Sequence, residues 1–103
     1  MPDDTPILMF NALWFNPDGG AEKYLEYMRA AFPIVQRHGG KKSTGGTPDK
    51  AVIGTFDADL IFFVEWPSWA AFKAFLADPE FEAVRPLREA AITNSLLIRC
   101  HPM

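Results

Sequence analysis

The chain has 103 residues, of which 49% are hydrophobic and 14% aromatic, and a formal net charge of −3 at pH 7. This length predicts one domain, spanning residues 1–103, and the apolar content excludes an intrinsically disordered chain. The acidic balance excludes the positive field with which proteins hold nucleic acid or anionic membranes, and no apolar run reaches the ~20 residues that cross a bilayer.

The first expected element is a strand over 6–15, PILMFNALWF, in which Asn11 alone interrupts an apolar run. Both alternating sets of side chains are hydrophobic, which predicts a strand covered on both faces. A helix over 21–38 follows, because Leu25, Met28, Phe32 and Val35 recur at spacings of three and four. Pro33 predicts a kink in this helix, and the glycines at 39 and 40 predict its end.

The polar, glycine-rich stretch 41–50 is expected to form a short edge strand and a loop. The segments AVIGTF (51–56) and LIFFVEW (60–66) then read as two strands of a β-hairpin, joined by an acidic turn. Ser68 is expected to cap a helix that reaches Ala77, and Asp78 to cap a second helix whose first residue is Pro79. The last strand is SLLIRC, 95–100.

The order strand, helix, strand, strand, helix, strand is that of the ferredoxin-like βαββαβ fold, an α+β fold with an antiparallel sheet and helices on one face. If the strand set that contains Phe10 faces the helices, an apolar set on the opposite face is left uncovered. Such a face predicts a two-fold homodimer that packs sheet against sheet. The uncovered set would be Ile7, Met9, Leu13, Ile61 and Phe63.

Three stretches resemble the dimeric α/β-barrel superfamily, and specifically the family of domain of unknown function 1330: RHGGK, VEWPSWAAF and DPEFEAVRPLREAA. The antibiotic biosynthesis monooxygenase family is similar at a greater distance. The resemblance implies a dimeric α/β barrel with a ferredoxin-like fold. The superfamily also holds haem-degrading monooxygenases, muconolactone-isomerase-like enzymes and stress-response proteins, so the resemblance leaves the reaction open.

The same resemblance suggests a site. In the monooxygenase branch an Asn on the first strand orients substrate beside a Trp at the end of the third, and Asn11 and Trp66 match these positions. In haem-degrading members a His on the second helix ligates iron, and Arg85 stands in its place here. Because Arg has no lone pair to offer a metal, we expect no haem held by this ligand. We expect no cofactor. Asn11 equally fits a structural amide satisfied by neighbouring backbone.

Glu65 fits either a general base or a structural ion pair with Arg99. His38 fits either a group that stabilises a helix C-terminus or an acid–base residue. Arg85 and Arg88 could clamp an anionic substrate, or could pair with Glu82 and Glu89 on a solvated helix face. These alternatives stay open from the sequence.

Two His and one Cys without ligand spacing predict no dedicated metal site. The lone Cys100 excludes an internal disulfide and is typical of a reducing compartment; it fits a small buried hydrophobe better than a reactive thiol. With the acidic start MPDDTP, unlike a signal peptide, this predicts a cytoplasmic protein.

We therefore expect an apolar pocket lined by Asn11, Trp14, Trp66, Phe72 and either His38 or Arg85. The function expected is the binding, or the cofactor-free monooxygenase- or isomerase-like conversion, of a small apolar metabolite. The catalytic candidates are Asn11, His38 and Glu65. The alternative is a non-enzymatic stress-related or structural homodimer, which would have Asn11 hydrogen-bonded in a solid core with no cavity.

Overall fold

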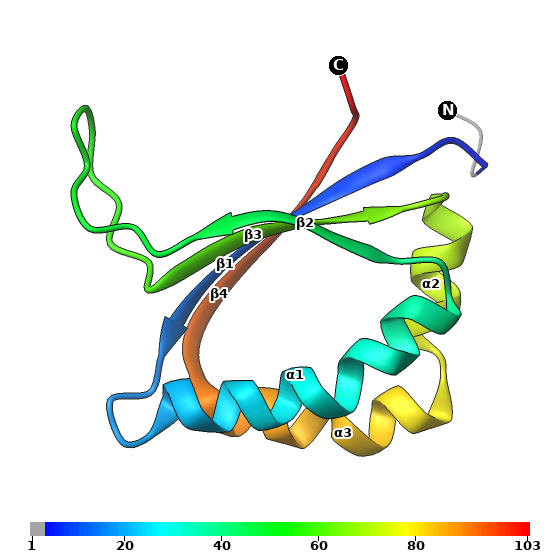
Figure 1. Ribbon diagram of the computed structural model, residues 1–103, viewed down its shortest axis with the longest axis horizontal. Helices are drawn as coiled ribbons and strands as arrows, with labels where there is room; N and C mark the ends of the chain where they lie inside the picture. The colour runs from blue at the N-terminus through cyan, green and yellow to red at the C-terminus, as the bar shows by residue number, and fades with distance from the viewer. Residues whose placement is uncertain (1–3) are drawn as a thin grey trace.

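The computed structural model describes residues 4–103. Its elements are β1 (Ile7–Phe15), α1 (Gly20–Arg37), β2 (Lys41–Gly46), β3 (Leu60–Trp66), α2 (Trp69–Leu76), α3 (Pro79–Ala91) and β4 (Ile92–Cys100). The strands form one antiparallel sheet in the order β2-β3-β1-β4, and all three helices lie on one face of it (Figure 1). This is the predicted ferredoxin-like α+β fold. The sheet is open, with β2 and β4 at its edges, and does not close into a barrel.

The strand register corrects the expected assignment of sheet faces. Met9 lies opposite Val64, whereas Phe10 lies opposite Phe63, so odd-numbered residues of β1 share a face with even-numbered residues of β3. The expected uncovered set therefore divides between the two faces. Ile61 and Phe63 lie on the outer face as expected, but Ile7, Met9 and Leu13 are buried beneath the helices. Because both alternating sets of β1 are apolar, the pattern by itself does not say which set turns inward.

Helix α1 forms where expected but is rotated relative to the predicted core stripe. Its buried positions are Gly20, Tyr24, Tyr27, Ala31 and Ile34. Leu25, expected in the core, is 55% exposed, and the rest of the predicted stripe is only half-buried. The helix ends as predicted, because Gly39 adopts a left-handed φ of 85° and the Gly40 amide donates to Val35 O at 2.9 Å.

The predicted hairpin between 51–56 and 60–66 is wrong. The partner of β3 on that side is β2, which pairs with it despite its polar, glycine-rich sequence. A strand at 51–56 would need its own edge of the sheet, and both neighbours of β3 are already in place. Residues 47–59 instead form a long loop that extends beyond the sheet, where Val52 and Ile53 are 88% and 95% exposed (Figure 1).

The crossover from β3 to β4 follows the predicted capping chemistry. Ser68 Oγ accepts a hydrogen bond from the Ala71 amide at 3.0 Å, which starts α2. Asp78 Oδ1 accepts from the Glu80 amide at 2.9 Å, and Pro79 occupies the first turn of α3. An aromatic cluster joins this crossover to the sheet, with ring centroids 5.0 Å apart for Trp66 and Phe75.

No helix within residues 4–103 is long and apolar enough to cross a membrane.

Candidate functional site

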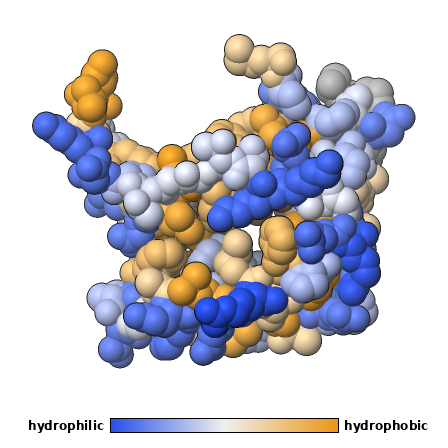
Figure 2. Space-filling view, in the orientation of Figure 1, coloured by the Kyte–Doolittle hydropathy of each residue, from blue (hydrophilic) through white to orange (hydrophobic). Residues whose placement is uncertain are grey.

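A cavity of about 400 Å³ lies between the helix layer and the inner face of the sheet. Figure 2 shows the molecule hollowed between these two layers, with hydrophobic groups within the hollow and hydrophilic groups along its rim. Its volume falls within the range of small-molecule sites. Both layers contribute to its wall, because side chains from the sheet and from the helices α1, α2 and α3 line it.

The sheet wall comes from the inward residues of β1 and β3. Asn11 lies opposite Phe62, and Met9 opposite Val64, so their side chains share the face that the helices cover. Trp66 closes the end of this wall. Pro67 directly after it biases Trp66 toward the extended backbone that ends the strand, and the Ser68 cap begins α2 at once. The tight corner thereby keeps the indole at the edge of the cavity.

The Trp66 indole is 3% exposed and held by neighbouring aromatic rings. Its ring centroid lies 5.4 Å from that of Phe72 in an edge-on arrangement and 5.0 Å from that of Phe75. A glycine at position 40 is required here, because a Cβ on Gly40 would lie 2.6 Å from Val35 Cγ1 and 3.0 Å from the Trp66 ring. The helix-ending glycine pair thus also makes room for the indole.

Asn11 places a half-buried amide in the apolar sheet wall. Its Nδ2 donates to Met9 O at 3.2 Å, which matches part of the structural alternative considered from the sequence. No second hydrogen bond of this side chain is formed within residues 4–103. Because an amide group has two donor hydrogens and one acceptor oxygen, Asn11 keeps hydrogen-bonding capacity for a ligand in the cavity.

The helix wall brings two tyrosines into the cavity. Tyr24 and Tyr27 are 4% and 7% exposed, and their ring centroids lie 5.4 Å apart. Burial raises the pKa of both hydroxyl groups above the ordinary value, while the nearby positive charge of Arg88 opposes this rise. Both hydroxyl groups are therefore neutral at physiological pH and can donate a hydrogen bond to a ligand.

Cationic side chains also line the cavity. Arg85 lies over the Phe81 ring, 5.4 Å from its centroid, and forms an exposed ion pair with Glu82 at 3.3 Å. Lys42 Nζ lies 5.5 Å from the centroid of Phe62. Arg88 belongs to the same lining. The sequence left open that Arg85 and Arg88 pair with glutamates on a solvated face of the helix. Of the two arginines, Arg85 forms such a pair, with Glu82.

Of the residues expected in the pocket, the structure brings together Asn11, Trp66, Phe72 and Arg85. Trp14 does not join them. It lies beside the long loop, where its Nε1 donates to Asp57 Oδ1 at 2.8 Å and its ring meets Phe56 edge-on at 5.7 Å. Its place on β1 explains this, because Trp14 and Asn11 point to opposite faces of the strand.

Glu65 and His38 also lie outside the cavity lining. Glu65 is exposed on the outer face of the sheet, opposite Leu8, whereas Arg99 is on the inner side, with its guanidinium 4.7 Å from the centroid of the Trp69 ring. The ion pair considered between Glu65 and Arg99 is therefore not formed. His38 caps the C-terminus of α1, where Nε2 lies 2.8 Å from Asp78 Oδ2.

Sequence reasoning missed both tyrosines as site residues. A second apolar stripe on this helix, with spacings of three, four and three, is as regular as the predicted one and consists of Tyr24, Tyr27, Ala31 and Ile34. Three residues of the predicted stripe line the cavity beside it: Met28, Phe32 and Val35. The apolar face of α1 is thus wide enough to serve both the core and the cavity.

Within residues 4–103, no three His, Cys, Asp or Glu side chains gather in a group that could hold a metal ion. Arg85 is engaged with Glu82 and with the Phe81 ring.

The family model of DUF1330, a domain of unknown function, matches residues 19–99. A solved protein of unknown function from Rhodopseudomonas palustris is 35% identical over 97% of this chain and 84% of that chain, with a TM-score of 0.89. No curated protein matches the chain.

Two further solved structures share the fold at low identity. A dimeric ferredoxin-like protein of unknown function from Jannaschia is 14% identical over 94% of this chain and 99% of that chain, with a TM-score of 0.77. An antibiotic biosynthesis monooxygenase-like protein from Bacteroides thetaiotaomicron is 13% identical over 99% of this chain and 93% of that chain, with a TM-score of 0.71. At such identities the likeness concerns the fold alone.

Proposed function

The chain belongs to the DUF1330 family, a domain of unknown function, and from this premise we propose that it binds a small apolar metabolite in the cavity between sheet and helices. The cavity itself is the observation that carries the proposal. A purely structural dimer would fill the space above Asn11 with side chains, since empty volume in a core lowers stability. Here Asn11 and Trp66 line one cavity of about 400 Å³.

We extend the proposal to conversion of the ligand without a cofactor, of the monooxygenase or isomerase type. Asn11 is the one catalytic candidate that lines the cavity. Its amide and the neutral hydroxyls of Tyr24 and Tyr27 can hold and polarise a carbonyl or phenolic oxygen of the ligand. The apolar rings around them exclude water, which strengthens each of these hydrogen bonds. His38 and Glu65 have no part in this proposal.

The proposed assembly is a homodimer of single-domain chains that pack through the outer face of the sheet. Phe10 and Phe63 lie there with ring centroids 5.4 Å apart, and Leu96 and Ile98 on β4 are 39% and 46% exposed. A contiguous apolar sheet face of this kind marks an interaction surface, and the same face of a second copy can bury it. A cytoplasmic location is part of the proposal and is supported by the free thiol of Cys100.

A thermal-shift screen with small aromatic and aliphatic compounds tests binding, since a ligand that binds only the native state raises the melting temperature. Met28→Trp places an indole ring in the cavity, and Leu25→Trp adds the same ring on the exposed side of the same helix. We expect Met28→Trp to abolish the ligand-induced shift and Leu25→Trp to retain it. An equal shift in both variants would place binding elsewhere, and no shift with any compound would favour the structural dimer.

A further inference from the structure

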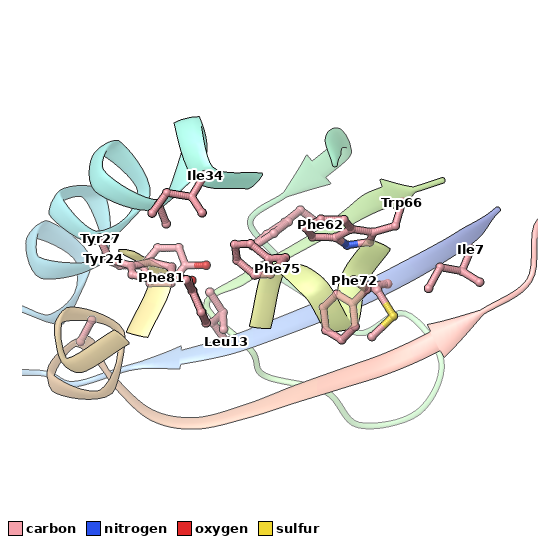
Figure 3. Packing of buried hydrophobic residues seen from close by; sticks show 13 residues of the cluster. Ile7, Leu13, Tyr24, Tyr27, Ile34, Phe62, Trp66, Phe72, Phe75 and Phe81 are labelled. Carbon is pink, nitrogen blue, oxygen red and sulfur yellow. The ribbon is translucent and has the colours of Figure 1, made fainter. Parts of the chain in front are cut away.

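The cavity has a polar end and an apolar end. Figure 3 shows Tyr24 and Tyr27 grouped with Phe81 at one end of the buried cluster, and Trp66 with Phe72 at the other. The positive charges of Arg85 and Arg88 act on Tyr27, and that of Arg88 acts on Tyr24. Both arginines line the cavity, so two hydroxyl donors and two guanidinium groups gather at the same end.

Within residues 4–103, only part of the positive charge at this end is paired with a carboxylate. Arg85 is engaged by Glu82 on the exposed side of α3, at 3.3 Å. Arg88 forms no ion pair with a carboxylate in residues 4–103. Among the described residues, 4–103, three cationic side chains and one carboxylate, that of Glu89, line the cavity, whereas the net charge of the chain is −3. The cavity lining thus has the opposite charge balance from the chain as a whole.

Neutral hydroxyl donors beside an unpaired guanidinium match one kind of ligand group. Each of these side chains can donate a hydrogen bond and the guanidinium is positively charged, so an acceptor group with negative charge complements them. The opposite end is formed mainly by the rings of Trp66, Phe72 and Phe75, whose carbon surface matches an aromatic ring or a hydrocarbon chain.

We infer that the natural ligand is an apolar carboxylate, with its acid group beside Arg88, Tyr24 and Tyr27 and its ring or chain against Trp66 and Phe72. This inference rests on the proposed function and names the ligand class of the same cavity. Arg88 is a binding residue in this arrangement, and Arg85 lies next to it as a second source of positive charge.

Calorimetric titration of the full chain with two probes of the same apolar body tests the inference: 4-phenylbutanoate and 4-phenylbutanol. We expect the acid to bind at least about tenfold more tightly than the alcohol, because a charge-assisted hydrogen bond is roughly twice as strong as a neutral one. Arg88→Gln should lower the affinity for the acid by about this factor and the affinity for the alcohol much less. The matched control is Arg29→Gln, which removes the same charge from an exposed position of α1 outside the cavity.

The outcomes separate this inference from the proposed function. Equal affinity for acid and alcohol in the native chain would overturn the anionic ligand class while leaving apolar binding intact. A larger loss of acid affinity in Lys42→Gln than in Arg88→Gln would also overturn it, because the acid group would then lie at the β2 side. If neither probe binds, the inference fails, and the thermal-shift screen then decides the proposed function separately.

Discussion

His38 Nε2 lies 2.8 Å from Asp78 Oδ2, so the residue that caps the end of α1 is joined to the residue that caps the start of α3. The same oxygen accepts a hydrogen bond from Arg37 Nη2 at 2.7 Å. These two hydrogen bonds hold the pKa of Asp78 well below its ordinary value, and the bond with His38 has the larger effect. The joint fixes how the two helices above the cavity approach each other.

This arrangement predicts a contribution to stability that disappears in acid. The folded pKa of Asp78 lies below the unfolded value of about 3.9, so the contribution is complete above that value and is lost as the pH falls from there through the folded pKa. Asp78→Asn keeps a capping side chain but removes the charge. In urea unfolding, the stability difference between native chain and variant should shrink from about pH 5 to about pH 2. Asp18→Asn, an exposed carboxylate without such partners, is the control, and an undiminished difference for Asp78→Asn would contradict the prediction.

Gly40 makes room for Trp66, and a methyl group there would not fit. In Gly40→Ala, the new Cβ would meet Val35 Cγ1 at 2.6 Å and the Trp66 ring at 3.0 Å, so these groups must move. We expect the free energy of unfolding to fall by ~1–3 kcal/mol, the range typical of overpacking. Gly46→Ala is the matched control, because no atom lies within 4 Å of the added Cβ. Equal free energies of unfolding for the two variants in urea titrations would contradict the prediction, because Val35 and Trp66 would then admit the methyl group without cost.

The outer face of the sheet is predicted to hold the dimer. Phe63→Glu places a charge beside Phe10 at the proposed interface, and burying it there unpaired is unfavourable. Sedimentation at micromolar concentration should show a monomer or loss of folding for this variant. Leu87→Glu introduces the same group on the exposed side of α3, and we expect that variant to remain dimeric. A native chain that sediments as a folded monomer would contradict the assembly.

Asn11→Leu separates a structural amide from one that serves a ligand. Within the described residues its side chain forms one hydrogen bond, to Met9 O in the same strand, and the side chain is half-buried. If the amide serves the ligand, the variant should be as stable as the native chain or more stable, with weakened binding of 4-phenylbutanol and 4-phenylbutanoate alike. A loss of ~1–3 kcal/mol of stability with unchanged binding would assign Asn11 to the fold alone.

The strand-to-helix corner and the caps of the second crossover could be predicted because their causes are local. Pro67 restricts the residue before it, Ser68 supplies an oxygen to an amide three residues on, and Asp78 precedes a proline that fits the first helical turn. No distant contact is needed for any of these features. The order of elements followed from them and from the length of the apolar runs.

The parts of the site that escaped prediction depend on choices made by the whole fold. Strand β1 is apolar on both faces, so its sequence does not decide whether Met9 or Phe10 faces the helices. Helix α1 has two adjacent apolar stripes, and only packing against α3 and the sheet selects Tyr24 and Tyr27. The run 51–56 has a strand-like composition, yet β2 pairs with β3 in its place.

The most direct test of the cavity as a ligand site is a ¹H–¹⁵N spectrum recorded during titration with 4-phenylbutanoate. The indole N–H of Trp66 and the side-chain amide of Asn11 should shift together and saturate, because both groups line the cavity. The indole N–H of Trp14, which is bonded to Asp57 beside the long loop, is the internal control and should stay in place. Shifts at Trp14 with none at Asn11 and Trp66, or no saturable shift at all, would contradict the account.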